Sequence, residues 1–105
     1  MKITVNINRT QLNEIIFALQ NERPELDNLT IIDKVYFCLF NQVFKKLLKK
    51  QIDKADDRIN KPFKIEMEYP LAAALLNEVN QVETTHDYRK NCIRILKMDL
   101  RQKIT

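Results

Sequence analysis

The chain has 105 residues, of which 45% are hydrophobic and 30% are charged, and a formal net charge of +4 at pH 7. These values are typical of a globular protein with one hydrophobic core, so we expect residues 1–105 to form a single small, soluble domain. The sequence contains neither Gly nor Ser, which excludes glycine-rich phosphate-binding loops and serine hydrolases.

Residues 1–44 predict a strand followed by two helices. Residues 2–8 alternate between apolar and polar side chains, which is the two-residue period of a strand with one buried face. Apolar residues then recur at helical spacing as far as Pro24, before which the first helix is expected to end. Asn8 or Thr10 is expected to cap this helix, because both side chains accept hydrogen bonds from its first backbone N–H groups.

The second predicted helix is longer and more apolar than the first. A capping box at residues 30–33 marks its start, and the pattern continues to about Ile52. Its apolar side chains cover well over half of a helical wheel, whereas a helix packed on one side needs a narrower stripe. We therefore expect this helix either to lie centrally, with neighbours on two sides, or to face another chain. In the second case the interface, which we call the apolar set, consists of Phe37, Phe40, Phe44 and Leu48.

Residues 63–105 predict the same order of elements again. Residues 63–69 alternate like the first strand, a third helix spans residues 71 to about 82, and a fourth follows a cap at residues 84–87. Because the chain has no Gly, helix ends are expected on residues that tolerate the left-handed conformation. The candidates are Asn21, Asn60 and Asn80.

These elements predict an α+β fold, in which two short antiparallel strands are covered on one face by four helices. Alternatively, a partner chain completes the sheet, because an isolated pair of strands is only marginally stable. The two strand-helix-helix halves align without gaps at an offset of 60 residues, which places Ile3 on Phe63 (63 minus 3). The offset suggests a duplicated unit with a pseudo-twofold axis, but any two such units would align their apolar positions in this way.

Positive charge is concentrated in the middle of the sequence. Residues 45–64 hold eight basic and three acidic side chains, whereas residues 1–44 hold four and five. Within this segment, residues 45–62 form the basic helix end and the connector to the second strand. The cluster indicates a surface for nucleic acid or an acidic protein, although lysines near a helix C-terminus also complement its dipole. The candidate contacts, which we call the basic set, are Lys45, Lys46, Lys49, Lys50, Arg58, Lys61 and Lys64.

The sequence contains no recognisable catalytic constellation. His86 is the only histidine, and its place in a predicted cap argues against a general base or a metal ligand. Cys38 and Cys92 lack CxxC spacing and are expected to pack in the core. Glu66 and Glu68 share one face of a strand, where solvated cross-strand pairs are favoured over a metal site or a shared proton. We expect no enzymatic activity, no cofactor and no metal.

The remaining features bear on location and function. Residues 1–8 lack the apolar segment of a signal peptide, and the longest apolar run, residues 35–40, is far shorter than the roughly 20 residues of a membrane span. The cysteines do not form a disulfide framework, which favours a reducing, cytoplasmic location. We expect a non-enzymatic protein-interaction module, acting as a homo-oligomer or with a protein partner. The alternative is a nucleic-acid-binding protein that uses residues 45–64.

Overall fold

The structure is a computed structural model of the whole chain. It describes residues 2–22, 31–56 and 58–104, but not the side chains of residues 31–33 and 36. The elements are β1 (Lys2–Ile7), α1 (Arg9–Asn21), α2 (Ile31–Asp53), β2 (Phe63–Glu68), α3 (Tyr69–Val79) and α4 (Asp87–Ile104). The expected α+β fold, with its repeated strand-helix-helix order, is confirmed. The capping box predicted at residues 30–33 lies outside the described side chains.

The two strands form an antiparallel sheet, which we call the ribbon. Their alternate apolar side chains are buried, as the two-residue period predicts. The strand predicted at residues 63–69 ends one residue earlier, at Glu68, because Pro70 occupies the first turn of α3. The buried ribbon residues are Ile3, Val5, Ile7, Phe63, Ile65 and Met67.

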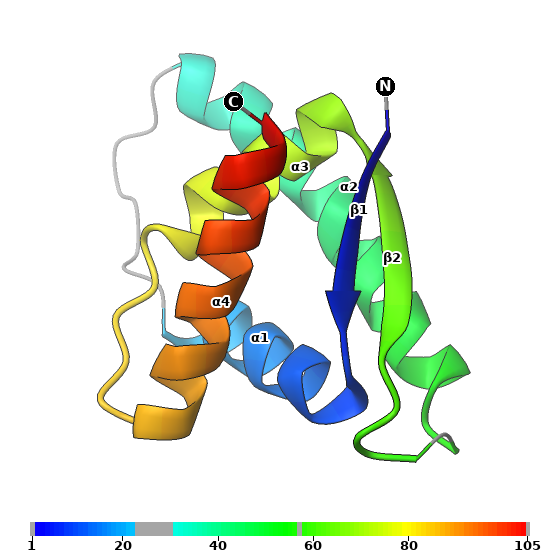
Figure 1. Cartoon of the computed structure of the whole chain (residues 1–105). Helices are drawn as coiled ribbons and strands as arrows, with labels where there is room; N and C mark the ends of the chain where they lie inside the picture. Colours follow the sequence, from blue (N-terminus) through cyan, green and yellow to red (C-terminus); the bar gives the residue numbers. More distant parts are fainter. Residues whose placement is uncertain (1, 23–30, 57, 105) are drawn as a thin grey trace.

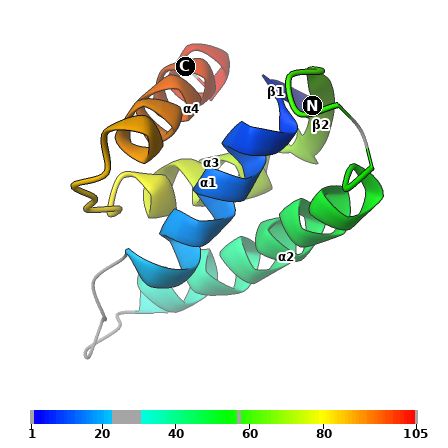
Figure 2. The same ribbon diagram turned by 90° about the horizontal axis from the view of Figure 1, so that it is seen from below.

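The helices pack in layers against the inner face of the ribbon (Figure 1). Seen from below, α1 and α3 lie between α2 on one side and α4 with the ribbon on the other (Figure 2). Both α1 and α3 contact α2 and α4. The core therefore receives side chains from every element, including Ile15 of α1, Val43 of α2, Leu75 of α3 and Leu100 of α4. Burial of each such side chain stabilises the fold by about 1.5–3 kcal/mol.

Local signals explain where the helices begin and end. Asn8 caps α1: its side chain accepts a hydrogen bond from the Gln11 backbone at 2.8 Å, and the Gln11 side chain accepts one from the Asn8 backbone at 3.0 Å. Helix α1 ends at Asn21 and α3 is capped by Asn80, as predicted, whereas Asn60 ends no helix. The expected left-handed conformation at these ends is wrong, because no described residue has a positive φ. Asn80 instead continues in the right-handed region, and a turn hydrogen bond from the Val82 N–H to the Val79 carbonyl oxygen follows it. No helix within residues 2–22, 31–56 and 58–104 is long and apolar enough to cross a membrane.

The register of the ribbon agrees with the predicted pseudo-twofold repeat. Val5 and Ile65 lie directly opposite each other in the ribbon, and they are also equivalent at the 60-residue offset (65 minus 5). Equivalent positions in α1 and α3 are buried alike, as Leu19 and Val79 show. A pseudo-twofold axis that relates the complete halves, and their origin by duplication, stay predictions.

Candidate functional site

The basic set lies at one end of the molecule, where the last turns of α2, the connector and the start of β2 meet (Figure 1). Two contacts hold this end against α1: the Arg9 guanidinium donates to the Ala55 carbonyl oxygen at 2.6 Å, and the Gln51 side chain donates to Asn13 at 2.8 Å. Phe63 anchors the start of β2 in the core. Contacts with α1 on one side and with the core on the other therefore fix the position of the segment that carries the basic set.

The charges of the basic set face solvent. Lys50 is half-buried, with its ammonium 5.9 Å from the centroid of the Phe63 ring, and the other members are exposed. Among the residues that the structure describes, no carboxylate forms an ion pair with any member of the set; the ion pairs seen involve other cations, such as Lys2 and Arg89. Asp53 and Asp56 are exposed in the same segment. The described residues of this surface therefore carry more positive than negative charge.

Most side chains of the apolar set pack against the protein's own core. Phe40 is only 2% exposed and its ring stacks on Phe44, with 5.5 Å between the ring centroids. Phe44 and Leu48 are half-buried against the core, and Phe37 is 45% exposed. Helix α2 packs against both α1 and α3 but lies on the outside of the fold, so it is not the central helix of the first expectation (Figure 2). Phe40 is corrected from an interface residue to a core residue, because its side chain is buried within the protein.

A different helix carries exposed apolar residues that the sequence analysis did not single out. Tyr88, Ile95 and Met98 of α4 are all exposed, Met98 by 51%. Their spacing of seven and three residues places them within one narrow arc of the helix, away from the buried residues Leu96 and Leu100. The only sequence signal for this second stripe is its spacing, which looks the same as that of a core stripe.

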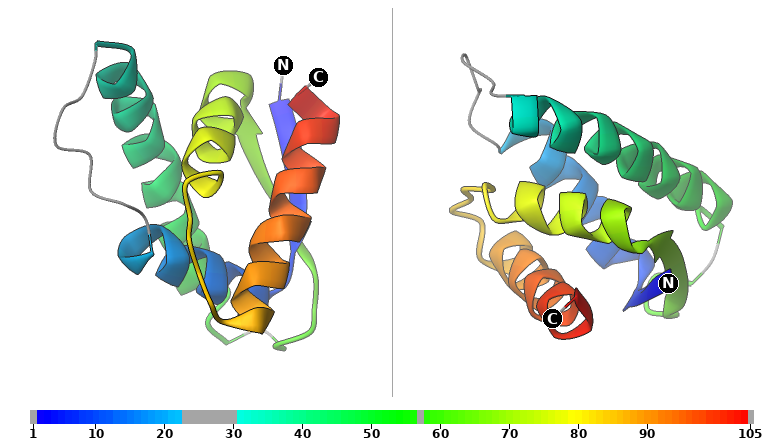
Figure 3. Two further views of the ribbon diagram at one scale, coloured as in Figure 1. Left: turned by 90° about the vertical axis from the view of Figure 1, so that its left-hand side faces the viewer. Right: turned by 90° about the horizontal axis from the view of Figure 1, so that it is seen from above.

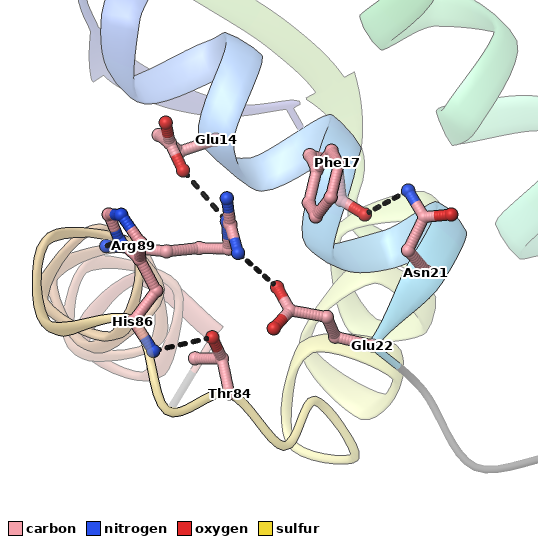
Figure 4. A network of polar contacts seen from close by, with 7 residues as sticks. All are labelled: Glu14, Phe17, Asn21, Glu22, Thr84, His86 and Arg89. Atoms are coloured by element: carbon pink, nitrogen blue, oxygen red, sulfur yellow. Dashed lines mark hydrogen bonds and ion pairs between the residues drawn. The ribbon is translucent and has the colours of Figure 1, made fainter.

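His86 caps α4, as predicted, and no carboxylate among the described residues makes a hydrogen bond with it. Its backbone N–H donates to the Thr84 hydroxyl at 3.2 Å, and its Nδ1 accepts from the Arg89 backbone N–H at 3.3 Å. The nearby carboxylates of Glu14 and Glu22 bind Arg89 instead, at 2.8 and 3.0 Å (Figure 4). This region is therefore a structural link between α1 and α4.

Glu14 and Glu22 favour the positively charged form of the Arg89 guanidinium. Desolvation lowers the pKa of its guanidinium, but the hydrogen bonds and charges of Glu14 and Glu22 outweigh that effect and raise the pKa above its ordinary value. The guanidinium also lies over the Phe17 ring, 4.1 Å from its centroid. Arg89 therefore stays positively charged and does not serve as an acid or a base.

The two cysteines differ in exposure. Cys92 is 3% exposed, and burial raises the pKa of its thiol, against the smaller effect of a hydrogen bond with Tyr88. A raised pKa leaves the thiol a poor nucleophile. The expectation that both cysteines pack in the core is wrong for Cys38, which is exposed on α2. The reason is helical geometry, since Cys38 precedes buried Phe40 by two residues and so points to nearly the opposite side.

Glu66 and Glu68 are both exposed on the outer face of the ribbon. Glu66 forms the expected solvated pair, with the Lys2 ammonium 4.0 Å from one of its carboxylate oxygens. Across the ribbon Lys2 faces Glu68, and Thr4 faces Glu66. Within the described part of the chain, no three His, Cys, Asp or Glu side chains are grouped so that they could hold a metal ion.

Comparison of the chain with protein-family models, curated proteins and solved structures found no match. Two surfaces of the protein are candidates for a functional site: the basic set at the end of α2, and the exposed stripe of Tyr88, Ile95 and Met98 on α4.

Proposed function

We propose that this protein is a non-enzymatic module that binds nucleic acid through its basic segment, residues 45–64. The observation that carries the proposal is the absence of ion-pairing carboxylates around the basic set in the described residues. Phosphates of a nucleic acid would supply the missing negative charge, and each contact would release condensed counterions. The binding energy would come mainly from this electrostatic term.

Complementing the helix dipole accounts for only part of this charge. The effect is confined to the last turn of a helix, and in α2 that turn contains Lys50 alone of the basic residues. Arg58 and Lys61 lie beyond the helix, and Lys64 lies on β2. A charge cluster that extends through three successive segments favours an extended anionic partner.

The composition of the basic set defines what kind of contact it would make. Six of its seven members are Lys, whose ammonium is a point charge on a flexible stem, whereas Arg is the usual bidentate reader of guanine. Such a set suits phosphate contacts, which position a protein on nucleic acid without reading sequence. We therefore expect the members of the basic set on α2 and in the connector to contribute affinity but no sequence preference.

The test compares two double charge reversals by fluorescence anisotropy with labelled DNA and RNA. Lys45→Glu/Lys49→Glu removes two members of the basic set, and Lys90→Glu/Lys97→Glu makes the same change in net charge on α4. We expect the first variant to lose at least about tenfold in affinity and to show a smaller salt slope, by about 0.9 for each lost contact. Equal effects of the two variants, or no binding by the unaltered chain, would refute the proposal.

Self-association through α4 is a second candidate, supported by the exposed stripe of Tyr88, Ile95 and Met98. A contiguous apolar patch on a monomer often marks an interface, and a twofold dimer would pair the stripe with itself. Light scattering coupled to size exclusion should show a dimer that Ile95→Lys/Met98→Lys converts to a monomer. Val35→Lys, a change at an exposed apolar residue of α2, should leave the dimer intact. A monomer at every concentration would eliminate this candidate.

A further inference from the structure

The outer face of the ribbon is a polar surface of which the two candidate functions use only Lys64. The inner face packs on the core, and in the right-hand view of Figure 3 the ribbon lies at the edge of the molecule. Thr4 is half-buried and the other side chains of this face are exposed. One hollow there is lined by Lys2, Ile3, Thr4, Asn6, Lys64, Glu66 and Lys103, so one carboxylate lies among its basic and amide side chains. The residues of the outer face are Lys2, Thr4, Asn6, Lys64, Glu66 and Glu68.

We propose that this face enters the major groove of duplex DNA, with Asn6 and Lys64 reading base edges. The inference rests on the proposed function, because the basic set would supply the phosphate contacts. It follows from the size of the ribbon: two strands about 4.8 Å apart fit a groove about 12 Å wide, which admits a two-stranded ribbon. In the described part of the chain the sheet has two strands, so no third strand there blocks that approach.

Charge along the ribbon decides which end approaches the DNA. Glu66 and Glu68 lie toward the end that leads into α3, where Lys2 lies opposite Glu68 and close to Glu66. At the other end Asn6 faces Lys64 across the strands. That end follows directly on the connector of the basic set, with Lys61 three residues before Lys64. Phosphates are therefore attracted to the Asn6–Lys64 end and repelled from the other.

Asn6 and Lys64 would also recognise different bases. An Asn amide can bond both N6 and N7 of adenine, and a Lys ammonium can donate to O6 and N7 of guanine. At the 60-residue offset Asn6 is equivalent to Glu66 (66 minus 6), and Thr4 to Lys64 (64 minus 4). The halves of the ribbon thus carry different side chains. We expect a short non-palindromic site that contains an A·T and a G·C pair.

The test is selection of bound duplexes from a randomised DNA library, followed by competition between the selected and a scrambled duplex. Asn6→Ala and Lys64→Ala should each reduce the preference for the selected duplex at least about fivefold. Asn6→Ala should leave the salt slope unchanged, since it removes no charge. Matched controls are Asn41→Ala and Lys90→Ala, which change exposed residues of α2 and α4. Unchanged thermal unfolding of each variant shows that the fold is retained.

Four outcomes overturn this inference. Salt-sensitive binding without any selected motif, or a preference unaffected by Asn6→Ala and Lys64→Ala, removes the ribbon contact but leaves the proposed function in place. Binding confined to RNA or single strands does the same, because the major groove of A-form helices is too narrow for a ribbon. If the unaltered chain binds no nucleic acid, the proposed function fails as well.

Discussion

Arg89 is the residue that most clearly ties distant parts of the chain together. Its guanidinium reaches Glu14 and Glu22, which are 75 and 67 residues away in sequence, and it covers the Phe17 ring (Figure 4). The side chains of all three charged partners are largely withdrawn from solvent. A planar guanidinium can serve two carboxylates at once, which the single ammonium of Lys cannot do with the same geometry.

Replacement of Arg89 should therefore destabilise the protein more than replacement of another arginine on the same helix. Arg89→Ala leaves two shielded carboxylates without their cation, whereas Arg94→Ala changes an exposed side chain. We expect a lower urea midpoint for Arg89→Ala than for Arg94→Ala, with Arg89→Lys between them. Similar midpoints for the two alanine variants would show that the network contributes little.

The buried thiol of Cys92 should make the protein sensitive to alkaline pH. Its pKa is raised from the ordinary value of 9.0, mainly by burial, so the folded state holds the proton more tightly than the unfolded state. The resulting stability is fully present below pH 9.0 and is lost as the pH rises through the folded pKa. Urea unfolding across this range should show a decline in the free energy of unfolding that is weaker in Cys92→Ala.

Cys38→Ala is the control for this measurement, because Cys38 is exposed. That variant should keep the decline of the unaltered chain. A thiol reagent should likewise modify Cys38 rapidly in the folded protein and Cys92 only slowly. A decline of the same size in Cys92→Ala would assign the alkaline sensitivity to other groups.

At the scale of elements, α2 shows how one helix serves two purposes. Its 23 residues bury Phe40, Val43 and Leu47 between neighbouring helices, while its last turns present Lys45 and Lys49 to solvent. A helix can do both because residues three and four apart share a face and residues two apart do not. Part of the wide apolar arc packs against α1 and α3, and the rest, which includes Val35 and Phe37, is exposed.

Two aliphatic residues near the end of α2 test this division. Leu47 is buried and Ile52 is 75% exposed. Leu47→Ala should lower the free energy of unfolding by about 2–4 kcal/mol, because it removes buried methyl groups and leaves a cavity. Ile52→Ala should change it by no more than about 0.5 kcal/mol. Urea denaturation followed by circular dichroism distinguishes them, and equal losses would contradict the observed packing of α2.

At the scale of the whole molecule, the two halves complete each other. Each contributes one strand to the ribbon, and helices of each half pack on helices of the other, as α2 does on α3 and α1 on α4. The apolar faces of one half alone would remain open to water. The positive charge, in contrast, is not shared equally, because the basic set lies in a single stretch of the chain.

Separated halves should consequently fail to fold as monomers. Peptides 1–62 and 63–105 each keep one strand and lose its partner, so we expect little cooperative thermal unfolding by circular dichroism in either. Folding that depends on peptide concentration would indicate a dimer of halves, which is what the duplication hypothesis predicts. A half that unfolds cooperatively and independently of concentration would contradict the mutual dependence.

The sequence by itself determined the elements and their order. The strands follow from a two-residue period and the helices from recurring apolar positions, because each backbone conformation repeats its side-chain directions over a few residues. The cap at Asn8 and the turn at Pro70 are similarly local. The α+β class followed from that order, since amphipathic elements have few ways to bury their apolar faces together.

Only the tertiary structure decided which apolar and polar side chains meet. On α2 the Phe40 side chain is buried and Cys38 is exposed. Arg89 forms ion pairs with two carboxylates from a distant part of the sequence, and Asn6 lies opposite Lys64 in the ribbon. None of these outcomes is encoded in local spacing, because each depends on how separate elements pack. The charge of the basic set could be read from the sequence, but its position at one end of the ribbon came from the fold.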